Sequence, residues 1–291
     1  IDVKKDNNKI SNEIDKAKKK FVDLNVFKNW KIGFSYGITQ FDGDIRQHNH
    51  YPAYQENGDF YELKTAASFS IYKRINSFYS ISAELIKGKF SGLRRKNEYL
   101  GYTVYEPYPN NYEGNGDKFV SSFNEGDIIL HVNLSNVFEY LFSTRQVNKL
   151  HFDGKVGIGY NIYNTVRRNL LTDTYIYSFG YEDEGSNSPG SDYGNKKMSV
   201  FESPSETVYL YGLQANYKLN DKLNIILGYV VRNGKTDKWD ASIMNTQNLT
   251  DKFDFLSLGF SYNLGDHNYN NEWKSPIDNI NSSVNIIKAN I

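Results

Sequence analysis

The side chains with the right types for acid–base chemistry gather in two polar stretches of the sequence. Catalysis by such groups needs a nucleophile or an activated water held beside a base. Neither stretch has a spacing that fixes a nucleophile next to a base, and the pattern is more typical of solvated loops. We therefore predict no catalytic residue and no enzyme. The candidates considered are His48 and His50 with Asp42 and Asp44 in the first stretch, and Asp237 and Asp240 in the second.

The sequence contains few of the side chains that a metal or cofactor site needs. The sequence has no cysteine, which excludes a thiolate metal site, a disulfide and a cysteine nucleophile. His131 and His151 fall on neighbouring predicted strands, but two histidines alone do not complete a zinc site. Gly157 and Gly159 lie inside a predicted strand and not at a strand–helix junction, so they predict no phosphate loop. We expect no metal and no cofactor.

The composition narrows the class of protein that must position these groups. Lys plus Arg and Asp plus Glu each number 34 in 291 residues, so no excess of charge favours nucleic acid as a partner. Aromatic residues make up 15% of the chain, although its mean hydropathy is -0.64. No run approaches the roughly 20 consecutive apolar residues of a membrane-spanning helix. High aromatic content with low hydropathy is typical of a membrane β-barrel, in which half of each strand and all the loops are polar.

Residues 30–39 predict the first strand of such a barrel. Large apolar side chains alternate without error with small or polar ones, which is the period of a β-strand. The broad face suits lipid, and the small side chains suit a narrow lumen. The broad face consists of Trp30, Ile32, Phe34, Tyr36 and Ile38, and the other face of Lys31, Gly33, Ser35, Gly37 and Thr39.

Seven further alternating segments follow, which gives an even count of eight. The connections alternate between long and short, as they do in outer-membrane barrels with short periplasmic turns and longer extracellular loops. We therefore predict an all-β fold, an eight-stranded antiparallel transmembrane β-barrel with both termini in the periplasm. A soluble barrel such as a lipocalin would turn its apolar face inward instead. The predicted strands are residues 30–39, 61–72, 78–88, 127–135, 150–163, 207–219, 222–232 and 253–264.

The predicted inward faces carry many ionisable side chains. An eight-stranded barrel is just wide enough for side chains to fill, and opposite charges there should pair because an unpaired buried charge is costly. We expect a satisfied polar network, with a proton path or gated pore as the alternative. Its predicted members are Lys31, Glu62, Lys64, Glu84, Asp127, His131, His151, Asp153, Lys155 and Arg232.

The two terminal segments, residues 1–28 and 265–291, flank the predicted barrel at 29–264. Apolar residues of the first segment follow the 3.6-residue period of an amphipathic helix. Such a stripe would lie on a membrane or a partner, or pack under its own barrel. The residues that we expect to contact a partner are Ile10, Ile14, Phe21, Leu24, Trp273, Ile277 and Ile280.

Three segments resemble the Bacteroidetes outer-membrane barrels of the OmpA type. They are Asn29–Gly33 with its continuation over Thr39–Ile45, the last strand Ser257–Leu264, and Glu272–Asp278. The last strand is similar to the signal by which the barrel-assembly machinery recognises its clients, and this resemblance assigns the signal to Gly259, Tyr262 and Leu264. In such proteins the third segment leads toward a peptidoglycan-binding domain, which these 291 residues do not contain.

We expect a non-enzymatic barrel with a structural, envelope-anchoring role in the bacterial outer membrane, as an accessory subunit of a larger outer-membrane complex. The alternative is a small-barrel enzyme or a lipid- or ligand-binding protein that acts through its extracellular loops. The expected partners are outer-membrane lipid and lipopolysaccharide, the barrel-assembly machinery, proteins of that complex, and peptidoglycan if a wall-binding domain follows.

Overall fold

The computed structural model describes residues 29–46, 52–55, 60–95, 116–142, 149–182, 195–242 and 250–264. Several predicted features lie outside these ranges. They are the helical stripe of residues 10–24, the histidines His48 and His50, and the partner residues Trp273, Ile277 and Ile280.

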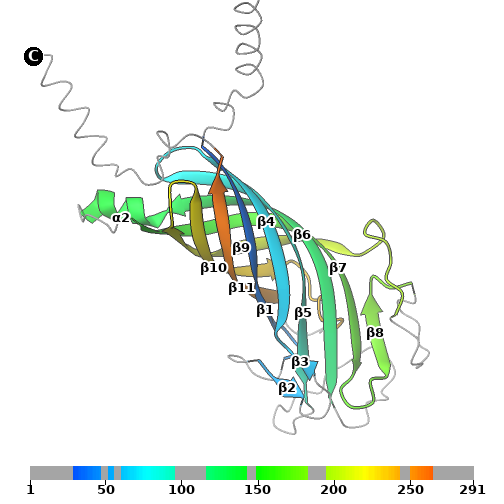
Figure 1. Cartoon of the computed structure of the whole chain (residues 1–291). Coiled ribbons are helices and arrows are strands. Elements are labelled where there is room, and N and C mark those ends of the chain that lie inside the picture. The colour runs from blue at the N-terminus through cyan, green and yellow to red at the C-terminus, as the bar shows by residue number, and fades with distance from the viewer. Residues whose placement is uncertain are drawn as a thin grey trace, which may run out of the picture.

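Eight long strands pair with their neighbours in an antiparallel sheet that closes on itself (Figure 1). The first and last strands complete the barrel, because Lys31 pairs with Asn263 and the register continues to Asp42 opposite Lys252. The predicted eight-stranded antiparallel barrel is confirmed. In their order around the barrel, its strands are β1 (Trp30–Asp42), β4 (Lys64–Arg74), β5 (Tyr79–Arg94), β6 (Asp117–Asn133), β7 (Leu150–Asn169), β9 (Ser205–Lys218), β10 (Leu223–Gly234) and β11 (Lys252–Asn263).

Shorter strands and one helix lie at the two ends of the barrel. A two-stranded hairpin, β2 (Tyr54–Gln55) with β3 (Phe60–Tyr61), and the strand β8 (Tyr175–Phe179), which extends the sheet beside β7, lie at the end with the long connections (Figure 1). The helix α2 (Leu134–Phe142) lies at the opposite end, where the sequence predicted the end of one strand at residue 135 and the start of the next at residue 150. The Asn133 side chain caps this helix by accepting a hydrogen bond from Asn136 N–H at 2.9 Å. Among the described residues, no helix combines the length and apolar character that crossing a membrane requires.

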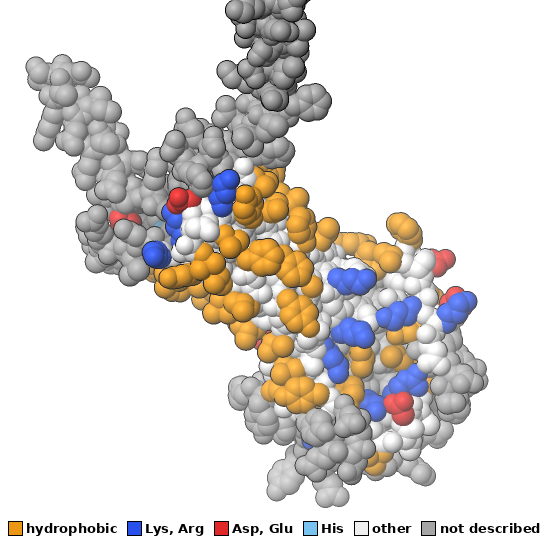
Figure 2. Space-filling view, in the orientation of Figure 1, with side chains coloured by type: hydrophobic (Ala, Val, Ile, Leu, Met, Phe, Trp, Pro, Cys, Tyr) orange, Lys and Arg blue, Asp and Glu red, His pale blue; other side chains and the backbone are white. Residues whose placement is uncertain are grey.

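A belt of apolar side chains surrounds the half of the barrel nearest the short turns. Figure 2 shows it as a continuous apolar zone on one face. Every strand of the barrel contributes to it, and Leu85 and Leu258 are 66% and 61% exposed. Its other members include Phe34, Tyr36, Phe69, Ile71, Ile128, Leu130, Val156, Ile158, Tyr209, Tyr211, Leu227 and Phe260.

Strands β5, β6 and β7 are longer than the sequence predicted. In β5 and β6 the polarity of the two faces reverses partway along, and in β7 the residues beyond 163 are mostly polar on both faces. Beyond the belt, Phe90, Phe119 and Phe123 point into the barrel, while Lys89 and Ser122 point outward. The loops predicted over 89–122 and 164–206 are therefore strand at residues 89–94, 117–122 and 164–169, and β6 begins ten residues earlier than expected. An apolar residue was expected to face outward everywhere, so this reversed alternation was not recognised as strand.

Candidate functional site

A buried ionic network crosses the barrel interior. Arg232 on β10 contacts Glu84 on β5, with 2.8 Å between Nη2 and Oε1. It also contacts Glu125 and Asp127 on β6, at 2.8 Å from Nε and 3.4 Å from Nη2. All four side chains are buried. One guanidinium thus ties three carboxylates from the opposite wall to β10 and occupies the middle of the lumen.

Neutral and basic groups complete the surroundings of these carboxylates. Asn161 on β7 donates a hydrogen bond to Glu125 Oε2 at 2.6 Å. Lys155, also on β7, is buried and interacts electrostatically with Glu84 and Asp153. Because three carboxylates surround the guanidinium, the second buried cation reduces the excess negative charge.

The half of the lumen nearest the short turns holds a second polar group. His131 Nε2 lies 2.8 Å from Ser82 Oγ, and its ring packs beside Tyr72 with centroids 5.1 Å apart. The Lys31 ammonium lies 4.7 Å from the Tyr72 ring centroid, on its face. These contacts bridge β1, β4, β5 and β6, so this end is also filled by side chains.

Most of the predicted lumen residues are buried on the inner face. Glu62 and Lys64 are exceptions. Glu62 is buried but accepts a hydrogen bond from Leu93 N–H at 2.9 Å, so it holds the segment before β4 against β5. The Lys64 ammonium donates to the carbonyl of Tyr61 at 2.7 Å in an exposed position. The inward buried residues are Lys31, Glu84, Asp127, His131, His151, Asp153, Lys155 and Arg232.

Sequence reasoning missed Glu125, which binds Arg232. Its position lies on the part of β6 before residue 127, where the predicted strand begins. Glu125 and Asp127 share the inward face because they are two residues apart in one strand, so extending the alternation toward residue 117 would have found it.

The two lumen histidines do not form a pair. In the register of β6 with β7, His131 lies opposite Lys155, and His151 lies four residues farther along β7. Four residues of strand span roughly 13 Å. This separation excludes one metal ion bound by both side chains.

The half of the lumen nearest the long connections is closed by an aromatic plug. Phe90 stacks on Phe253 with ring centroids 5.0 Å apart, and it contacts Trp239 at 5.5 Å. Phe41 meets Phe119 edge to face at 4.7 Å. All five side chains are buried. These rings pack against one another inside the barrel.

Four carboxylates meet just above the plug, where the β10–β11 connection covers the segment after β1. Asp240 accepts hydrogen bonds from Ile45 N–H at 3.0 Å and Ser242 N–H at 2.8 Å. Asp251 accepts one from Trp239 N–H at 2.7 Å. Asp240 and Asp251 are fully buried. We call Asp44, Asp237, Asp240 and Asp251 the mouth carboxylates.

Burial, followed by crowding in two cases, raises the pKa of three of the mouth carboxylates. Burial raises the pKa of Asp240 to about 8, with repulsion from Asp44 and Asp237 adding to the effect and Arg167 opposing it. Burial and repulsion from Asp240 likewise raise the pKa of Asp251. Burial also raises the pKa of Asp44, although two arginines nearby oppose the shift. Protons therefore compensate part of the charge that this group would otherwise carry.

The mouth carboxylates bring together residues that the sequence placed in two separate candidate stretches. Asp42 is not among them, because it pairs with Arg46 at 3.0 Å and Lys252 at 2.8 Å. Asp237, Asp240 and Asp251 place carboxylate oxygens within 4.8 Å of one another, a spacing that sequence reasoning did not predict and that one hard cation could bridge. Since Asp240 and Asp251 are buried, they fasten the two connections together and present no open acid–base pair to a substrate.

The residues of the predicted assembly signal lie along the closing seam, by which we mean the pairing of β1 with β11. Gly259 faces the lumen opposite Ser35, and Tyr262 lies opposite Ile32 on the outer face. Leu264 follows the strand, and its N–H donates to the carbonyl of Trp30 at 2.9 Å. The signal thus coincides with the pairing of the first and last strands.

A closed eight-stranded barrel with an apolar outer belt and a filled interior is the architecture of small transmembrane β-barrels. No protein-family model matches the sequence, and no curated protein matches it significantly. Among solved structures, the chain is similar to Ail, the attachment invasion locus protein of Yersinia pestis, with 11% identity, coverage of 81% of this chain and 97% of that chain, and a TM-score of 0.37. Neisserial surface protein A is 10% identical, with coverage of 81% and 97% and a TM-score of 0.37. A major outer membrane protein from Thermus thermophilus is 10% identical, with coverage of 80% and 98% and a TM-score of 0.39.

Proposed function

We propose that this protein is a non-enzymatic β-barrel of the bacterial outer membrane with a structural, envelope-anchoring role. The observation that carries the proposal is the combination of the apolar belt outside with the buried ion pairs inside. We call Arg232 with Glu84, Glu125 and Asp127 the Arg232 network. Exposed apolar side chains in a continuous band are unfavourable in water but suited to lipid. Charged groups that pair with one another across the lumen need no water-filled channel around them.

A structural role fits the interior better than conduction. The Arg232 network and the aromatic plug lie one above the other, so an ion entering from either end meets buried side chains. A role in catalysis finds no support at the mouth carboxylates, because the hydrogen bonds of Asp240 and Asp251 are made to the backbone of the same connections.

The proposal is tested by refolding the purified protein into phosphatidylcholine vesicles. We expect a β-rich circular dichroism spectrum and slower or faster gel migration of unheated than of boiled samples. Membrane-embedded protein should also resist extraction by carbonate. A helical spectrum, identical migration before and after boiling, or full extraction would overturn the membrane barrel.

We further propose that the barrel is an accessory subunit of a larger outer-membrane complex, with both termini in the periplasm. The support is the apolar stripe of the N-terminal segment and the apolar residues after the barrel, which closure of the strands does not require. Deletion of residues 1–26, and separately of 266–291, should preserve heat-modifiability while releasing co-purifying proteins. Retention of every partner by both truncations would contradict the docking of these segments.

A further inference from the structure

The upper edge of the apolar belt is sharply defined on the face formed by β4, β5 and β6. Along the outward side of β5, Leu85 is followed by Lys87 and Lys89, and all three side chains are exposed. Successive outward residues are about 7 Å apart along a strand. The surface therefore changes from apolar to basic within one such step, and Figure 2 shows lysine and arginine side chains gathered directly beyond the apolar zone.

A third lysine reaches the same place from the connection after β8. The Lys197 ammonium donates a hydrogen bond to Ser122 Oγ at 2.7 Å, and Ser122 is paired with Lys89 across β5 and β6. Burial lowers the pKa of Lys197, and repulsion from Lys89 and Lys87 lowers it further. Glu182, on the same connection, is paired with Lys196 at 2.7 Å. We call Lys87, Lys89 and Lys197 the basic patch.

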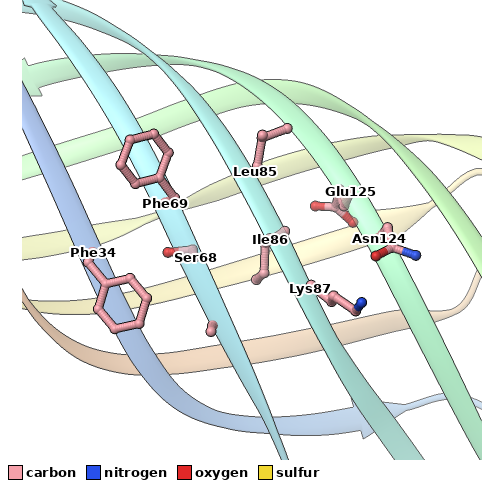
Figure 3. A pocket seen from close by; sticks show the side chains of 9 residues that line it. Phe34, Ser68, Phe69, Leu85, Ile86, Lys87, Asn124 and Glu125 are labelled. Atoms are coloured by element: carbon pink, nitrogen blue, oxygen red, sulfur yellow. The ribbon is translucent and has the colours of Figure 1, made fainter.

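An open depression on the outer wall includes Lys87 of this patch in its lining (Figure 3). The small side chain of Ala67 lines this depression and lies opposite Lys87 in the pairing of β4 with β5. In the row toward the belt, Phe34, Phe69 and Leu85 lie side by side on three strands. The depression is thus apolar on the side of the belt and has a lysine at its border.

The geometry points to a binding site for the phosphorylated headgroup of lipopolysaccharide, with one acyl chain lying over Ala67 and the headgroup phosphate at the basic patch. This inference rests on the proposed outer-membrane setting, in which the end with the long connections faces outward. Lysines that flank an apolar surface attract anionic headgroups, and their stems remain in contact with the acyl region. A cluster of exposed cations is complementary to a phosphate-rich lipid and repels a basic partner.

The test compares two pairs of charge reversals in the full chain. Lys87→Glu with Lys89→Glu reverses two of the three charges of the basic patch, whereas Lys149→Glu with Lys222→Glu makes the same change of charge at two exposed lysines near the short turns. Native mass spectrometry from a mild detergent would measure binding of bisphosphorylated lipid A. We expect the first pair to weaken binding by at least about tenfold and the second pair to leave it unchanged. Equal losses, or no loss in either pair, would overturn the site.

Two further arms separate the lipid source from general attraction of anions. Phosphatidylglycerol should bind the wild-type chain more weakly than bisphosphorylated lipid A, and equal binding would refute the assignment to lipopolysaccharide. Ala67→Trp fills the depression without changing charge, and we expect it to weaken lipid A binding severalfold. Heat-modifiability of every variant in phosphatidylcholine vesicles tests the barrel separately. A chain that inserts normally but does not select lipid A would refute only this inference.

Discussion

Arg232 on β10 and Glu125 on β6 form an ion pair across the barrel interior, with 2.8 Å between Nε and Oε1 and both side chains fully buried. The two strands are not neighbours in the sheet, so this contact joins opposite walls directly. A buried charge that loses its partner is strongly destabilising, whereas replacement of a whole pair by apolar groups is often tolerated.

Replacement of Arg232 by methionine should therefore reduce the free energy of unfolding by about 3–5 kcal/mol, because Glu84, Glu125 and Asp127 would lose their shared cation. Urea unfolding in vesicles, followed by tryptophan fluorescence, would measure the change. Adding Glu125→Gln to this variant should recover part of the loss, and Lys222→Met at an exposed site should have little effect. An unchanged free energy of unfolding in Arg232→Met would show that the network does not hold the opposite walls together.

The filled lumen predicts that the purified protein forms no stable open pore. The Arg232 network and the aromatic plug leave no continuous path for hydrated ions, since an eight-stranded barrel is only wide enough for its own side chains. Recordings in planar bilayers should show no steady single-channel current. Large, reproducible currents from pure protein would refute this prediction and make Lys31 and Glu84 the first residues to mutate.

The apolar belt predicts which substitutions impair insertion. Phe34 is 44% exposed on the outer face of β1, and a lysine there should cost about 2–4 kcal/mol of insertion free energy if the residue lies near the bilayer midplane. Ser35→Ala, on the inner face of the same strand, is the matched control and should change little. The folded fraction in vesicles over a denaturant series measures both. Equal tolerance of the two variants would contradict lipid contact at Phe34.

The mouth carboxylates predict that stability falls as the pH rises. In the unfolded chain these groups titrate near pH 4, whereas burial and mutual repulsion raise the folded-state pKa of Asp240 to about 8. The folded state then binds more protons between these values, so this stabilisation is complete below about pH 4 and lost as the pH approaches 8. Asp251→Asn should flatten the pH dependence of the melting temperature and raise it at alkaline pH. An unchanged pH profile in this variant would show that the group does not titrate with folding.

The barrel could be predicted from sequence because its membrane-facing half follows one simple rule. In residues 30–39 and 150–163, large apolar residues alternate with small or polar ones, and the pairing of β1 with β11 follows from an even number of strands. The rule fails beyond the belt, where Phe90 and Phe123 turn inward and Lys89 turns outward. Alternation persists there with the opposite polarity, because this part of the wall has an apolar plug inside and a basic surface outside.

The contacts inside the barrel and at its mouth were predicted less completely, because the residues that make them are far apart in the sequence. Arg232 and Glu84 are 148 residues apart, and Asp240 and Ile45 are 195 apart. Only the closed sheet brings such groups together, so their types could be predicted but not their partners. Glu125 was missed for a local reason, since its strand was judged to begin two residues after it.

The closing seam carries the last prediction. A Cβ atom on Gly259 would collide with the carbonyl oxygen of Phe34 and with Ser35 Oγ, so only glycine fits between β11 and β1 at this position. Gly259→Val should destabilise the folded barrel by about 1–3 kcal/mol through overpacking. Gly126→Val is the matched control, because a Cβ there would meet only Leu85 at an ordinary 3.6 Å.

Refolding into vesicles without any assembly factor separates this steric effect from recognition of Gly259 as part of an assembly signal. If sterics govern, Gly259→Val lowers stability in vesicles and the yield of inserted protein in cells, while Gly126→Val leaves both unchanged. Normal stability in vesicles combined with failed insertion in cells would instead assign the requirement to the assembly machinery. Normal stability in vesicles together with normal insertion in cells would contradict the close packing of β1 against β11. The two strands would then have to move apart at Ser35 without weakening their pairing, which also joins Lys31 to Asn263.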